Sequence, residues 1–67
     1  MNNSYEVGSV VRFTPRDDDV ECIGTIVAYY NHNELYEIEV KDMLDTAPHN
    51  YTGDTVTAYS DTIYEEV

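Results

Sequence analysis

Basic residues are scarce in this sequence of 67 residues. It has 3 Lys+Arg against 14 Asp+Glu, which gives a formal net charge of −11. Affinity for nucleic acids and for anionic membranes comes mainly from Lys and Arg side chains at phosphate groups. The charge therefore predicts no direct nucleic-acid partner and no membrane partner. It favours a protein partner with a basic surface, because opposite charges speed encounter. Acidity that only maintains solubility is the alternative interpretation.

Cysteine is nearly absent, since Cys22 is the only one in the chain. No disulfide can form within the chain, and a single thiol is typical of proteins in a reducing compartment. The opening segment MNNSYEVGS has neither the basic nor the apolar run of a signal peptide. No apolar run approaches the roughly 20 residues that span a membrane as a helix. These absences predict a cytoplasmic protein.

The sequence also lacks the complete pattern of a calcium site. Asp17, Asp19 and Glu21 occupy positions 1, 3 and 5 of a would-be calcium-binding loop. Such a loop needs Gly at position 6 and Glu at position 12. This chain has Cys22 and Ala28 there. We therefore predict no calcium site.

The sequence also lacks the residue patterns of zinc sites and of catalytic sites. Cys22, His32 and His49 are scattered, without the close pairs of ligands that structural zinc sites use. Acidic neighbours raise the pKa of a thiol rather than lower it, so Cys22 is predicted to serve packing. Glu37 and Glu39 lie on the solvent face of one predicted strand and define no cleft. We predict no catalytic residues, no metal and no cofactor, and therefore no enzyme.

Residues typical of β-strands dominate the chain. Val, Ile, Thr and Tyr are frequent, and Tyr alone occurs 7 times. The clearest period of two is LYEIEV, whose apolar residues Tyr36, Ile38 and Val40 point to one face while its glutamates point to the other. Strands are predicted over residues 9–14, 22–30, 35–40 and 55–60.

Turn formers and strand breakers separate these segments. Pro15 cannot donate to a strand ladder, so PRDDDVE at 15–21 is predicted to be a loop. Gly24 inside a strand indicates a bulge, a bend or a close approach of backbones. The remaining predictions are a hairpin loop at 31–34, an irregular connection at 41–54, and either a 3₁₀ turn or a last strand at 61–67.

Three segments carry a resemblance to a known fold. YEVGSVVRF at 5–13, IGTIVAYY at 23–30 and LYEIEV at 35–40 resemble the first strands of SH3-like small barrels of the KOW or Tudor kind. The resemblance implies an all-β fold, a small five-stranded antiparallel SH3-like barrel. We expect a single domain over residues 1–67, with residues 1–5 flexible.

The two kinds of barrel imply different roles. A KOW-type barrel is a nucleic-acid-associated accessory domain with basic loops, whereas here Arg12, Arg16 and Lys41 are the only Lys or Arg residues. A Tudor-type barrel uses an aromatic cage to read Lys or Arg side chains. The alternative to a cage is that the tyrosines cover the core and keep their hydroxyls in water. The candidate cage residues are Tyr29, Tyr30, Tyr36, Tyr59 and Tyr64.

The whole chain is similar in size and charge to the small acidic proteins with which lytic bacteriophages redirect host machinery. The resemblance implies a non-enzymatic inhibitor or modulator in the host cytoplasm. It would engage a basic surface of a host protein, including one that normally receives nucleic acid, as DNA mimics do. The oligomeric state is left open. The predicted partner-facing residues are Asp17, Asp18, Asp19, Glu21, Glu37, Glu39, Asp61, Glu65 and Glu66, with Tyr29, Tyr30 and Tyr59 as aromatic contacts.

Overall fold

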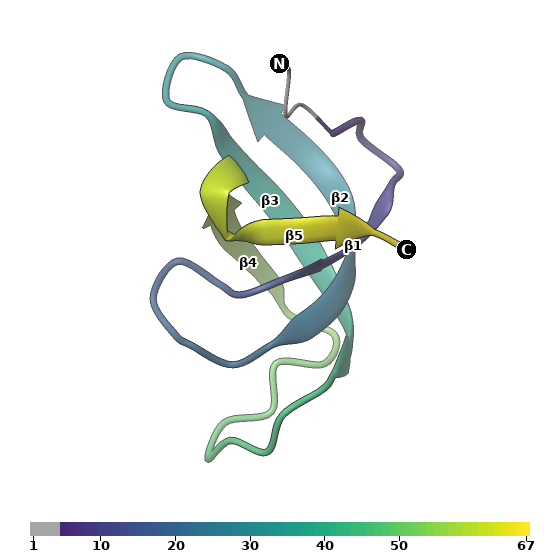
Figure 1. The fold of residues 1–67 in the computed structure, drawn as a ribbon, viewed down its shortest axis with the longest axis vertical. Coiled ribbons are helices and arrows are strands. Elements are labelled where there is room, and N and C mark those ends of the chain that lie inside the picture. The colour runs from purple at the N-terminus through teal and green to yellow at the C-terminus, as the bar shows by residue number, and fades with distance from the viewer. Residues whose placement is uncertain (1–4) are drawn as a thin grey trace.

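The computed structural model describes residues 5–67 and places five strands in one antiparallel sheet. The order across the sheet is β4-β3-β2-β1-β5 (Figure 1). The all-β, five-stranded antiparallel prediction is confirmed. Within residues 5–67 the edge strands β4 and β5 are not paired with each other, so the sheet is open. The elements are β1 (Val10–Phe13), β2 (Cys22–Tyr30), β3 (Leu35–Met43), β4 (Thr55–Tyr59), the 3₁₀ turn η1 (Ser60–Thr62) and β5 (Ile63–Glu66).

The strand boundaries follow the sequence pattern closely, with one extension. β2 has the predicted bounds, and β1 and β4 lie within the predicted segments. β3 continues three residues beyond the predicted end at Val40, because Asp42 pairs with Ile23 and Met43 pairs with Cys22. The pairing with β2 holds this extension in the strand, and the sequence of the extension itself does not indicate a strand.

The last segment resolves the choice that the sequence left between a turn and a strand. Ser60–Thr62 form the 3₁₀ turn, and Ile63 then begins β5, which pairs with β1. Ile63 is buried in the core. Both alternatives are therefore present in succession.

The sheet must curl, because its two edge strands are joined by a very short connection. Four strand spacings of about 4.8 Å would separate the edges of a flat five-stranded sheet by about 19 Å. The chain from Tyr59 to Ile63 can span only about 14 Å. Register shifts at Ile23/Gly24, Ile26/Ala28 and Arg12/Phe13 supply bends. Figure 1 shows the result, with β5 crossing in front of the sheet and β4 lying behind it.

Gly24 is the residue at which two backbones come closest. A Cβ atom built there would lie 2.5 Å from the carbonyl oxygen of Glu39 and 2.7 Å from Cγ2 of Ile38. Real Cβ atoms do not approach other atoms this closely. The register shift between Ile23 and Gly24 lies at the same point. The predicted bulge and close approach are both confirmed.

The core lies on the inner face of the curled sheet. On β3 the predicted alternation is confirmed, since Tyr36, Ile38 and Val40 are buried. The ring of Tyr29 stacks on that of Tyr36 at 4.5 Å. Of the segment 1–5 that was expected to be flexible, residues 1–4 lie outside the described residues. Tyr5 packs against the core, and its backbone N–H donates to the Tyr36 hydroxyl at 3.0 Å.

Candidate functional site

Arg12 is committed to contacts within the protein. Its Nε donates to Oε2 of Glu65 at 3.0 Å, and its guanidinium nitrogen Nη1 contacts the carboxylate of Glu21. The guanidinium carbon also lies 5.1 Å from the centre of the Tyr64 ring. Arg12 therefore ties β1 to β5 and to the end of the loop before β2. Glu21 and Glu65 were both predicted to face a partner. Their carboxylates instead pair with Arg12, which offsets part of their negative charge.

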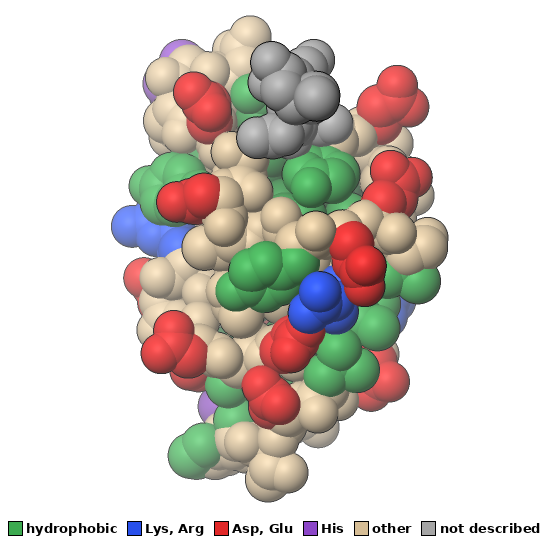
Figure 2. Space-filling view, viewed as in Figure 1, with side chains coloured by type: hydrophobic (Ala, Val, Ile, Leu, Met, Phe, Trp, Pro, Cys, Tyr) green, Lys and Arg blue, Asp and Glu red, His purple; other side chains and the backbone are tan. Residues whose placement is uncertain are grey.

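The other two cations are also beside carboxylates. Lys41 Nζ lies 3.3 Å from Glu39, and Arg16 Nε lies 3.6 Å from Asp17. These pairs are exposed, and exposed ion pairs contribute little to stability. Arg12, Arg16 and Lys41 thus form no basic patch, and each is surrounded by excess negative charge. Figure 2 shows acidic side chains spread over the whole of one face, with basic side chains beside them.

The acidic segment PRDDDVE is the loop between β1 and β2, as predicted. Its middle aspartate has a structural role. Oδ2 of Asp18 accepts a hydrogen bond from the Tyr51 hydroxyl at 2.7 Å, and Oδ1 accepts one from the backbone N–H of Asp19 at 2.8 Å. Asp17 and Asp19 are exposed. The three aspartates therefore divide into one anchor and two surface carboxylates.

The hydrogen bond to Asp18 raises the pKa of the Tyr51 hydroxyl, and burial and the charge of Asp18 raise it further. The neutral phenol is thus favoured in the folded state. Its contribution to stability is complete below the ordinary tyrosine pKa of about 10 and is lost as the pH rises through the higher folded value.

We expect Tyr51→Phe to lower the urea midpoint at pH 7, because the link to Asp18 is lost. The variant should also lose less stability than the wild type as the pH rises above about 10. Absorbance titration of the phenolates checks the same point, since the variant should lack one late-titrating tyrosine. If the tyrosine that the variant lacks titrates at the ordinary pH in the wild type, the contact with Asp18 does not hold in solution.

The strand register assembles a mixed acidic and aromatic surface. Leu35 pairs with Tyr30 on β2 and with Tyr59 on β4, and residues paired across antiparallel strands point to the same face. Glu37 and Glu39 follow on that face, because side chains alternate along β3. Tyr30 and Tyr59 are 42% and 38% exposed. We call the face formed by Tyr30, Leu35, Glu37, Glu39 and Tyr59 the outer face.

The candidate cage tyrosines are not brought together. Tyr36 is buried and stacked with Tyr29 on the inner side, whereas Tyr64 lies beside Arg12 on β5. Tyr59 lies beside Arg16, whose guanidinium carbon is 5.6 Å from the ring centre. The five tyrosines therefore fall into three groups. Tyr29 and Tyr36 form a stacked pair on the inner side, Tyr30 and Tyr59 lie on the outer face, and Tyr64 lies on β5. Tyr36 also differs from the alternative, because it is a core residue itself and its hydroxyl accepts a hydrogen bond from the backbone N–H of Tyr5 instead of lying in water.

The last two predicted carboxylates, Asp61 and Glu66, are not part of the outer face as defined. Asp61 is exposed on η1 directly after β4, and Glu66 is exposed on β5, which pairs with β1 and not with β3 or β4, so neither belongs to the strand register that forms the outer face. The structure therefore brings four of the predicted contact residues together, namely Tyr30, Glu37, Glu39 and Tyr59.

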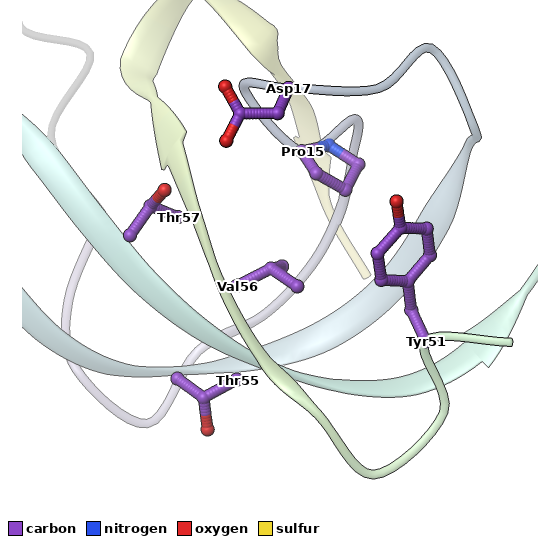
Figure 3. Close-up of a pocket in the computed structure, with 6 residues that line it drawn as sticks. All are labelled: Pro15, Asp17, Tyr51, Thr55, Val56 and Thr57. Atoms are coloured by element: carbon purple, nitrogen blue, oxygen red, sulfur yellow. The ribbon is translucent and has the colours of Figure 1, made fainter. Parts of the chain in front are cut away.

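A pocket that the sequence did not indicate opens between the acidic loop and β4. Its volume is about 310 Å³. Pro15 and Val56 give it apolar walls, and Tyr51 closes one end (Figure 3). Tyr51 comes from the irregular connection 41–54, which has no pattern that would predict its neighbours. The complete set of lining residues is Pro15, Asp17, Tyr51, Thr55, Val56 and Thr57.

The remaining groups with chemical potential are the Cys22 thiol and the side chains that could ligate a metal ion. Cys22 is buried, as its packing role predicts, and burial raises the pKa of its thiol, helped by the charges of Asp18 and Asp45. Within residues 5–67 no group of three or more His, Cys, Asp or Glu side chains is placed to hold a metal ion. In the same residues no helix is long and apolar enough to cross a membrane.

Comparison with known proteins adds no relative to this description. No protein-family model, curated protein or solved structure matches the chain.

Proposed function

We propose that this protein is a non-enzymatic binding module whose outer face engages a basic surface of another protein. The observation that carries the proposal is the register that places exposed Tyr30 and Tyr59 on the same face as Glu37 and Glu39. Tyrosines supply contact area with little loss of side-chain entropy, and carboxylates select a cationic partner. Among the described residues Glu37 forms no ion pair within 4 Å, so its charge is available to a partner.

The architecture supports a rigid platform for such a face. The curled sheet, with its edges joined through η1, supports assignment to the SH3-like small barrels. The size, the charge of −11 and the absence of a basic patch support a modulator of the kind that phages direct at host proteins. A partner surface that normally receives nucleic acid fits this charge best, because it is already complementary to closely spaced negative groups.

Affinity capture from a bacterial lysate tests the proposal. The immobilised wild-type protein should retain a basic protein at low salt and release it as salt rises, because screening weakens contacts between exposed charges. The control bait carries Glu37→Gln and Glu39→Gln and should retain markedly less of the same protein. DNA or RNA added to the lysate should compete for the partner.

Two outcomes would contradict the proposal. In the first, the wild-type bait retains no protein at low salt that the control bait fails to retain. The other is retention that ignores both salt and the two glutamates. Capture that depends on charge but resists competition by nucleic acid would exclude only the mimicry of nucleic acid.

A further inference from the structure

The pocket beside β4 is held in shape by contacts on both sides. The backbone N–H of Arg16 donates to the carbonyl of Thr57 at 2.9 Å, which fastens the acidic loop to the edge of β4. The Tyr51 hydroxyl donates to Asp18 at 2.7 Å, which fastens the same loop to the connection before β4. The pocket thus lies between two tied segments and does not depend on a free loop for its walls.

We propose that this pocket receives a lysine side chain of the partner protein. The inference deepens the proposed function and rests on it, since it identifies where that partner would insert a cation. The apolar walls come from Pro15, Val56 and the ring of Tyr51 (Figure 3). Long cationic side chains bury their methylene stems along such surfaces and keep the charged end at the rim. A volume of about 310 Å³ is at the lower end of the range for small-molecule pockets and has room for a lysine side chain.

The charge at the rim determines which side chain fits. Asp17 lines the pocket, and its side chain is 86% exposed. Its contact with Arg16 is long, at 3.6 Å, so an incoming ammonium group can share the carboxylate at little cost. Asp18 and Asp19 follow directly in the chain and add negative charge at the same loop. An apolar stem that ends in a cation matches this arrangement, whereas a purely apolar side chain would leave the rim charge unused.

The position of the pocket connects it with the outer face. Thr55 and Thr57 line the pocket, and the register pairs them with Glu39 and Glu37 on β3. A partner that covers the outer face would therefore extend across β4 to the pocket mouth. The two surfaces can contact neighbouring residues of one basic segment.

An NMR titration tests the pocket without any knowledge of the partner. The probe is Nα-acetyl-lysine methylamide, added to the ¹⁵N-labelled protein at constant ionic strength. The control probe is Nα-acetyl-norleucine methylamide, which has the same stem length without the ammonium group. We expect saturable amide shifts at Asp17, Tyr51 and Thr55–Thr57 with the lysine probe and none with the norleucine probe.

Matched variants locate the effect. Asp17→Asn should weaken binding of the lysine probe about two- to fivefold, the range of one exposed ion pair. Asp61→Asn removes the same charge from η1 and should leave binding unchanged. Shifts spread evenly over the acidic residues, equal shifts with norleucine, or equal effects of the two variants would overturn the inference.

The outcomes also separate this inference from the proposed function. Capture of a basic partner through Glu37 and Glu39, with no lysine-specific shifts at the pocket, would reject the pocket alone. Lysine-specific shifts in a protein that captures no partner would reject the proposed function and with it the assignment of the lysine to a partner.

Discussion

Replacing Gly24 with alanine is expected to lower the free energy of unfolding by about 3 kcal/mol. The added Cβ would lie 2.5 Å from the carbonyl oxygen of Glu39, and this oxygen belongs to backbone that cannot rotate away. Relief requires β2 and β3 to separate at the bulge, which would disturb the pairing between the two longest strands. Domains of this size are marginally stable, so a loss of this order would leave much of the protein unfolded.

Gly53→Ala is the matched control. Gly53 has φ of +90°, and a Cβ there would meet nothing within 4 Å. Its substitution costs backbone strain of about 1–2 kcal/mol without a steric clash. Urea unfolding followed by circular dichroism measures both variants. A Gly24→Ala variant no less stable than Gly53→Ala would show that the strands do not approach as closely as described.

Replacing Arg12 with methionine is expected to cost about 1–2 kcal/mol. Methionine keeps most of the apolar stem, so the change isolates the guanidinium group. Without it, Glu21 and Glu65 face each other across the site of the lost cation in a chain that already carries a charge of −11. The expected cost is below that of a fully buried ion pair because all three side chains are partly exposed.

Lys41→Met provides the control, because it removes the same charge from a pair that links only neighbouring residues of β3. It should cost at most about 0.5 kcal/mol. Added salt should recover part of the stability of the Arg12 variant, since screening weakens repulsion between the two carboxylates. Equal losses for both variants would mean that net charge, and not the position of Arg12, determines stability.

Local patterns in the sequence were sufficient for most of the fold. The alternation in LYEIEV identified the buried face of β3, and Gly24 within an apolar run identified the bulge. These features are visible because side-chain period and glycine placement are properties of short segments. A bent sheet was expected from the resemblance to small barrels, but the pairing of β5 with β1 was not visible, since it joins strands from opposite ends of the chain.

The candidate site was less predictable, for the same physical reason. Glu37 and Glu39 were identified as surface carboxylates from their own strand. The ion pair of Arg12 with Glu65 joins residues 53 positions apart, and the contact of Asp18 with Tyr51 joins residues 33 positions apart. Composition cannot indicate which of 14 acidic residues a cation will choose. The division between internal and surface carboxylates therefore required the structure.

The role of the outer face is tested most directly by the affinity of the captured partner for three proteins. These are the wild type, the variant with Glu37→Gln and Glu39→Gln, and the variant with Asp61→Asn and Glu66→Gln. The two variants remove the same charge, the first from β3 and the second from η1 and β5. Calorimetric titration at two salt concentrations should show about tenfold weaker binding for the Glu37 and Glu39 variant, which corresponds to about 1.4 kcal/mol. The affinity of this variant should also depend less on salt. The Asp61 and Glu66 variant should bind within about twofold of the wild type. Equal losses in the two variants, or a larger loss in the second, would contradict the assignment of the outer face as the binding surface.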